Sequence, residues 1–111
     1  MILEVRACGP FFKNGFVVGC ETTREGVLID PGDEVLMADP GYPCNRNFVR
    51  MMGGVPAEVP VGAESAYQLL PEMVARHWTS RTMAVMVASP SNPTGTLMPE
   101  DSLRAIIAIA R

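Results

Sequence analysis

Two proline-rich segments carry the side chains best suited to binding a planar ligand. Residues 39–43 read Asp-Pro-Gly-Tyr-Pro and present the ring of Tyr42, while residues 88–96 contain the carboxamide of Asn92. An aromatic ring can stack on a planar heterocycle. A carboxamide can donate a charge-assisted hydrogen bond to a phenolate oxygen, which is stronger than a neutral one. These two residue types therefore suit a flat ring that bears an oxygen.

Each segment follows an apolar run, residues 35–38 for the first and 83–88 for the second. Ligands bind at the carboxyl ends of strands in open α/β sheets, and prolines leave a loop few conformations. Two structural alternatives stay open on the residues alone. Tyr42 could pack on the helix that follows it, and the segment around Asn92 could simply connect a strand to a helix.

From residue 33 onward the apolar pattern alternates between strands and helices. Gly53 and Gly54 are typical of a helix end, and Pro71 is typical of a helix start. We expect strands near 34–38, 55–61 and 82–88, and helices near 45–52, 71–78 and 99–111. This order predicts an α/β fold, a three-layer αβα arrangement around a mainly parallel sheet.

The same pattern predicts which parts of these elements are buried. Pro56 and Pro60 restrict the second strand to an edge of the sheet, or are confined to the ends of that strand. Residues 82–88 look like the most buried strand. Apolar residues at helical spacing should face the core in the first and last helices. They are Phe48, Val49, Met51 and Met52, and Leu103, Ile106, Ile107 and Ala110.

Residues 1–29 are treated as a separate N-terminal segment beside a domain of residues 30–111. Residues 1–6 and 16–18 are expected to be strands, with a hairpin turn at Asn14-Gly15. Residues 19–26 are expected to be an irregular or weakly helical link.

Composition excludes several classes of protein. A chain of 111 residues with 48% hydrophobic residues can form one small domain. Its net charge of −3, without a basic cluster, argues against a nucleic-acid partner. No apolar run is long enough to cross a membrane, and no signal peptide is evident. Three cysteines and one histidine, without metal-ligand spacing, argue against a metal site and suggest free thiols in the cytoplasm.

Three motifs in order resemble the large domain of fold type I pyridoxal-phosphate enzymes, in particular class I/II aminotransferases. They are Asp-Pro-Gly-Asp-Glu-Val at 30–35, Asp-Pro-Gly-Tyr-Pro at 39–43 and Ser-Asn-Pro-Thr-Gly at 91–95. The resemblance covers residues 30–111 and implies amino-group transfer between an amino acid and a 2-oxo acid, with pyridoxal 5′-phosphate as cofactor. It implies that Tyr42 stacks on the pyridine ring and that Asn92 bonds the 3′-oxygen. It also makes Asn92–Pro93 a candidate cis peptide.

The resemblance also shows what this sequence lacks. The lysine that holds the cofactor as a Schiff base, the aspartate at the pyridine nitrogen and the substrate-binding arginine lie further downstream in the family. Lys13 is the only lysine in the sequence, lies upstream of every motif and reads as a surface residue. Residues 19–23, Gly-Cys-Glu-Thr-Thr, are the nearest match to the family's phosphate-binding turn. Thr22 and Thr23 could bind phosphate there or could be ordinary loop residues. No catalytic residue is therefore assigned, and we expect the chain by itself to be inactive.

The function expected from the sequence is that of a truncated aminotransferase-like protein. One alternative is a non-catalytic module that self-associates through its last helix and an edge strand, forming homo-oligomers. Another is a fragment of a different fold type I enzyme or regulator, because fold alone does not fix function.

Overall fold

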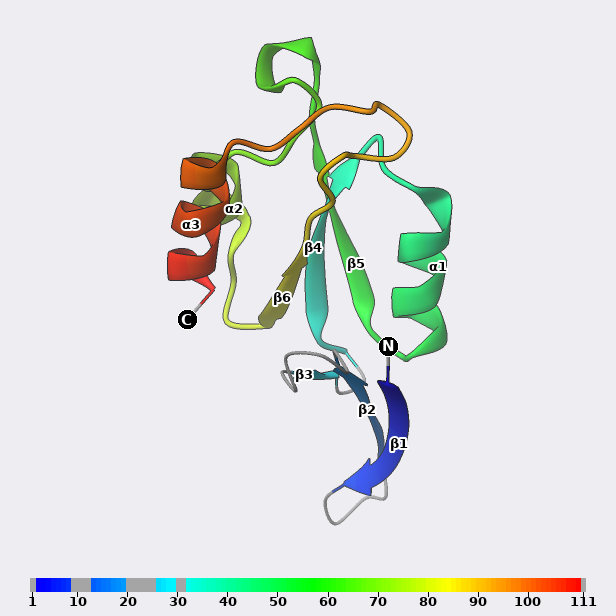
Figure 1. Cartoon of the computed structure of the whole chain (residues 1–111). Helices are drawn as coiled ribbons and strands as arrows, with labels where there is room; N and C mark the ends of the chain where they lie inside the picture. Colours follow the sequence, from blue (N-terminus) through cyan, green and yellow to red (C-terminus); the bar gives the residue numbers. More distant parts are fainter. Residues whose placement is uncertain (1, 9–12, 20–25, 30–31, 111) are drawn as a thin grey trace.

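A parallel three-stranded sheet organises the main body of the chain (Figure 1). The computed structural model describes residues 2–8, 13–19, 26–29 and 32–110. The sheet consists of β4 (Glu34–Asp39), β5 (Val55–Pro60) and β6 (Thr82–Met86), in the order β5-β4-β6. Both β5 and β6 run parallel to β4. The predicted parallel sheet and the edge position of the strand with two prolines are confirmed.

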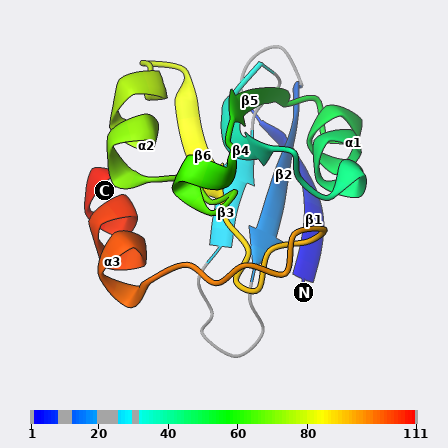
Figure 2. The same ribbon diagram turned by 90° about the horizontal axis from the view of Figure 1, so that it is seen from above.

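The described residues form three α-helices and one short 3₁₀ helix. They are α1 (Pro43–Met51), η1 (Ala63–Ser65), α2 (Pro71–His77) and α3 (Glu100–Ile109). Figure 2 shows α1 on one side of the sheet and α2 with α3 on the other. The predicted α/β class with three layers is confirmed, with helix bounds within three residues of those expected.

The end of α1 shows how local sequence sets an element boundary. The Gly53 N–H donates to Arg50 O at 3.0 Å, and the Gly54 N–H donates to Val49 O at 2.9 Å. These two bonds form a Schellman motif, which needs a left-handed residue after the helix. Gly53 supplies it with a φ of +82°.

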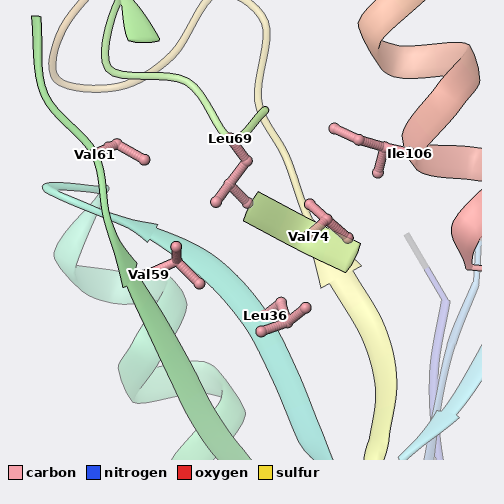
Figure 3. Close-up of a cluster of buried hydrophobic side chains, with 6 residues drawn as sticks. All are labelled: Leu36, Val59, Val61, Leu69, Val74 and Ile106. Atoms are coloured by element: carbon pink, nitrogen blue, oxygen red, sulfur yellow. The ribbon is translucent and has the colours of Figure 1, made fainter. Parts of the chain in front are cut away.

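Each face of the sheet has its own core because side chains alternate along β4. On one face, Leu36 of β4 packs with residues of β5, α2, α3 and the connecting segments (Figure 3). That cluster consists of Leu36, Val59, Val61, Leu69, Val74 and Ile106. On the other face, Val35 and Met37 pack against Val49 of α1. Covering both faces explains why β4 is an apolar run without polar alternation.

Two predictions about burial were wrong. The central strand β4, and not β6, is the most buried, because β6 lies at the edge of the sheet that the structure describes. The buried faces of the first and last helices are also narrower than expected. Only the side of each helix that faces the sheet is buried, and this side includes few residues in a short helix. Of the residues named, Phe48, Met51, Ile107 and Ala110 are exposed.

The N-terminal segment forms a separate antiparallel sheet of β1 (Ile2–Cys8), β2 (Lys13–Gly19) and β3 (Gly26–Ile29). The expected hairpin is present, but the predicted turn is wrong. Asn14 and Gly15 lie within β2, where they pair with Ala7 and Arg6. β1 extends to Cys8, beyond the strand expected at residues 1–6, and Cys8 pairs with Lys13. The pairing therefore continues past this local turn signal. The predicted link falls mostly on residues 20–25, outside the described residues, and β3 was not predicted.

No helix in the described ranges is both long enough and apolar enough to span a membrane.

Candidate functional site

The loops after β4 and β6 meet because these two parallel strands are neighbours. Tyr42 follows β4 and Asn92 follows β6, and both line one cavity at the carboxyl ends of the strands. Gly41, Asn45, Gln68 and Ser91 also line it. The structure therefore brings together the two side chains that the sequence analysis selected, at the edge of the sheet where it expected them.

Tyr42 is held by the backbone on both sides of it. A Cβ on Gly41 would lie 2.5 Å from the carbonyl oxygen of Ala38, so glycine allows the chain to turn closely after β4. Tyr42 itself is extended, with φ −63° and ψ 119°, and Pro43 begins α1 immediately after it. Tyr42 remains 43% exposed, so a ligand can reach this residue and α1 does not bury it.

The phenol of Tyr42 interacts with the thiol of Cys44. A side-chain hydrogen bond with Cys44, together with charge repulsion from that thiol when ionised and a small burial effect, raises the pKa of Tyr42. Cys44 is a free cysteine. Tyr42 therefore keeps its proton at neutral pH and presents an uncharged aromatic ring.

The loop that carries Asn92 is closed by backbone hydrogen bonds. Ser91 N donates to Thr96 O at 2.8 Å, and Gly95 N donates to Ser91 O at 2.7 Å. Gly95 has a φ of +71°, as the turn requires. The Asn92–Pro93 peptide is cis, as expected, and so are Asp39–Pro40 and Ser89–Pro90. Asn92 is exposed, and no hydrogen bond to its carboxamide is present in the part of the chain that the structure describes.

Gln68 is a cavity residue that the sequence analysis missed. Its side chain is buried, and its Nε2 donates to Thr96 O at 2.8 Å, with weaker contacts to Thr96 Oγ1 at 3.3 Å and Ala88 O at 3.4 Å. The available signal was one polar residue in the apolar run Tyr67–Leu70. Nothing local indicates its partners, because Thr96 lies 28 residues further along the chain.

Arg46 is the positively charged residue that lines the cavity. Its guanidinium lies 3.3 Å from Asp39 Oδ1 and 2.7 Å from Glu58 Oε1. These ion pairs join α1 to the end of β4 and to β5. Because two carboxylates already surround this guanidinium, Arg46 is a structural link and not a free anion-binding group.

The residues present match part of pyridoxal phosphate. An exposed tyrosine at one strand end, and at the next a carboxamide without a hydrogen-bond partner among the described residues, suit a planar heterocycle with an adjacent oxygen. The cavity holds about 40 Å³, far below the roughly 300–1,000 Å³ of pockets that enclose small molecules. The described residues alone therefore do not enclose a ligand of this size.

Thr22, Thr23 and Lys13 were also considered in the sequence analysis. Thr22 and Thr23 lie outside the described residues. Lys13 begins β2, in the small sheet beyond the amino end of β4, whereas Tyr42 and Asn92 follow the carboxyl ends of the parallel strands (Figure 1).

Comparison with known proteins agrees with the fold and the motifs. The family model "Aminotransferase class I and II" matches residues 14–111, so the chain belongs to the class I and II aminotransferase family.

Individual relatives are similar to this chain over more than two thirds of its length. A probable aspartate/prephenate aminotransferase of Thermus aquaticus is 46% identical over 83 residues, which are 75% of this chain and 22% of that protein. A valine–pyruvate aminotransferase of Mycobacterium tuberculosis is 44% identical over 77 residues, 69% of this chain and 20% of that protein. The chain thus spans about a fifth of the length of the curated relatives that it matches.

Solved structures show the same arrangement of elements. The structure of aspartate aminotransferase from Thermus thermophilus with maleate matches with a TM-score of 0.70 at 41% identity, covering 74% of this chain and 22% of that one. An aminotransferase from Mycobacterium tuberculosis matches with a TM-score of 0.68 at 42% identity, covering 73% of this chain and 21% of that one. The expectation of a partial aminotransferase fold is confirmed.

Proposed function

We propose that this chain forms the pyridine-ring wall of the cofactor site of a pyridoxal-phosphate-dependent aminotransferase. The observation that supports the proposal is the shared cavity, which exposed Tyr42 and Asn92 both line. The carboxamide of Asn92 has no hydrogen-bond partner among the described residues. The family match supports the choice of cofactor.

Each residue has a distinct role in this proposal. The uncharged ring of Tyr42 stacks on the pyridine ring and orients it. The Asn92 amide donates a hydrogen bond to the 3′-oxygen and stabilises negative charge there. The cofactor, when bound, supplies the electron sink for amino-group transfer. Residues 30–111 are the partial cofactor-binding large domain, and residues 1–29 are a separate segment.

Complete activity needs groups beyond those found in these 111 residues. Lys13 lies in the small sheet, so the chain by itself offers no lysine at the cavity and is proposed to be inactive alone. The reaction of the complete enzyme is proposed to be transfer of an amino group between an amino acid and a 2-oxo acid. The names of the relatives support this substrate class. Cytoplasmic location and a homo-oligomeric state are part of the same proposal.

The test uses a cofactor analogue that has no aldehyde, 4-deoxypyridoxine 5′-phosphate, so that no amine can react with it. The ¹⁵N-labelled chain is titrated and followed by NMR. We expect weak, saturable shifts at the Asn92 side-chain amide and at backbone amides near Gly41. Asn92→Ala should weaken binding about tenfold, as loss of a hydrogen bond to a charged group does.

Asn47→Ala is the matched control, because Asn47 is an exposed asparagine on α1 that does not line the cavity. It should leave binding unchanged. Shifts that do not saturate, or equal affinity in the wild-type chain and the Asn92→Ala variant, would contradict the proposal.

A further inference from the structure

We propose that Gln68 positions Asn92 by holding together the two ends of the loop that carries it. This inference rests on the proposed function, because it concerns the geometry of a cofactor-contacting residue. Gln68 is a positioning residue, since its amide hydrogens are directed at the protein and not at the open part of the cavity.

A strained backbone turn just before Gln68 places its side chain in the protein interior. Ala66 and Tyr67 both have left-handed backbones, with φ of 51° and 55°. Two successive non-glycine residues in this region are uncommon and persist only where surrounding contacts fix them. The Tyr67 N–H donates to Gly62 O at 2.8 Å, and the Gln68 N–H donates to Ser65 O at 3.0 Å. The result is a sharp turn after η1 that leaves Gln68 only 5% exposed.

The carboxamide of Gln68 then spans the loop. Its Nε2 contacts Ala88 O at the start of the loop and Thr96 O at its end, at 3.4 Å and 2.8 Å. Residues 88 and 96 bracket the whole segment that contains Asn92. A single buried donor group therefore sets the separation of the two loop ends.

A second hydrogen bond connects Thr96, the residue that Gln68 binds, to Ser91, which precedes Asn92. Thr96 O accepts from Gln68 Nε2 and also from the backbone N–H of Ser91, each at 2.8 Å. Ser91 precedes Asn92 directly in the chain. Because Asn92 has no side-chain partner of its own in the described structure, its position depends on this backbone arrangement.

The first test measures the loop without any ligand. Gln68→Met keeps the length of the side chain and removes its donors, and Gln68→Glu keeps its shape and removes the donors when ionised. We expect amide hydrogen exchange at Ser91 to speed up about tenfold, because the loop opens more often once the hydrogen bonds that hold its ends are lost. The amide of Val61, which donates to Asp39 O at 2.9 Å, reports the sheet and should be unaffected.

Ser65→Ala is the matched control. Ser65 is equally buried in the same turn, but its hydroxyl donates to Gly62 O and not to the loop. It should leave Ser91 exchange unchanged. Unchanged Ser91 exchange in both Gln68 variants would overturn the inference. Equal acceleration at Ser91 and Val61 would also overturn it, because Gln68 would then support general stability only.

The second test links the loop to the ligand through a double-mutant cycle with 4-deoxypyridoxine 5′-phosphate. Gln68→Met should weaken binding about fivefold in the chain with Asn92 and have no further effect in the Asn92→Ala background. Additive effects would overturn the positioning role. If Asn92→Ala alone has no effect on binding, the proposed function fails, and the exchange experiment still decides whether Gln68 holds the loop.

Discussion

Three side chains divide the work of the proposed site according to their exposure. Tyr42 and Asn92 are exposed and free to meet a ligand, whereas Gln68 is buried and bonded to the backbone of the loop. This division is what a binding wall requires, because the contacting groups must be accessible and their support must be rigid. Two predictions concern single residues.

The first is the ionisation of Tyr42. We expect it to titrate above the ordinary tyrosine pKa of about 10, because Cys44 raises the pKa. Because the pKa of Tyr42 is higher in the folded than in the unfolded chain, protonated Tyr42 adds to the free energy of unfolding. This contribution is fully present below pH about 10 and is lost as the pH rises through the pKa of folded Tyr42. Tyrosinate absorbance in a Tyr67→Phe background, which leaves Tyr42 as the single tyrosine, measures the midpoint. Adding Cys44→Ala should lower it, and an unchanged midpoint would contradict the assignment.

The second concerns the core. Leu36 lies in the central strand and is 1% exposed. Leu36→Ala should lower the free energy of unfolding by about 2–5 kcal/mol, because it removes buried methyl groups and leaves a cavity. Urea unfolding measures the loss. Met83→Ala in the edge strand β6, where Met83 is 54% exposed, should change stability by no more than about 0.5 kcal/mol. Similar losses in both variants would show that the core is misassigned.

At the scale of elements, α1 matters most because Tyr42 sits at its start. The helix is fixed at three places: Pro43 begins it, Gly53 follows its end, and Arg46 pairs with Asp39 and Glu58. Val49 packs its inner face against Val35 and Met37 of β4. The position of the Tyr42 ring is thus set by the ends and the inner face of one short helix.

The cap of α1 gives a test at this scale. Gly53→Ala should destabilise the chain by about 1 kcal/mol, because a Cβ disfavours the left-handed backbone that the Schellman motif needs. Gly53→Asn should cost less, since asparagine tolerates that conformation. Thermal unfolding followed by circular dichroism compares the two. Equal stability of the wild-type chain and the two Gly53 variants would mean that the Schellman motif does not stabilise the end of α1.

At the scale of the whole molecule, the order β5-β4-β6 makes the site possible. The central strand and one of its neighbours end in the Tyr42 and Asn92 loops, and the parallel arrangement places both loops at one edge of the sheet. The only lysine of the sequence lies in the other sheet. The two remaining predictions follow from this layout.

Pyridoxal phosphate itself should react with the chain only outside the cavity. After borohydride reduction, peptide mass spectrometry should find the pyridoxyl group on Lys13 and on the terminal amine, both without saturation at low concentration. Lys13→Arg should leave the terminal amine as the single site. Labelling of Lys13 that falls when Asn92 is replaced by alanine would show instead that this lysine reaches the cavity.

Self-association is the second prediction at this scale. Met83 on β6 and Ile107 on α3 are exposed large apolar residues, and such surface favours contacts between molecules. We expect the apparent mass in size-exclusion chromatography to rise with concentration. Replacing both residues by serine should reduce this rise, whereas Met51→Ser on α1, on the opposite side of the sheet, should not. A monomer at every concentration would contradict the proposed homo-oligomer.

Local chemistry was enough to predict the strands and α-helices from residue 33 onward and to select Tyr42 and Asn92 as candidates, which the structure places at one cavity. Prolines and glycines fix helix starts and ends within a turn of the chain, and apolar runs next to proline-rich motifs identify strand ends. Such signals act between near neighbours, so they are readable without the fold. The cis Asn92–Pro93 peptide and the partial aminotransferase fold came from the resemblance carried by three motifs, and both are confirmed.

What the sequence by itself determined is therefore the order of strands and helices, the family, and the pair Tyr42 and Asn92. Tertiary structure alone decided that β4 is central, that Asn14-Gly15 lies inside a strand, and that Gln68 holds a loop 28 residues away. These outcomes depend on contacts between distant segments, where strand pairing and burial outweigh local preference. The residues next to each of these positions in the sequence do not indicate such distant contacts.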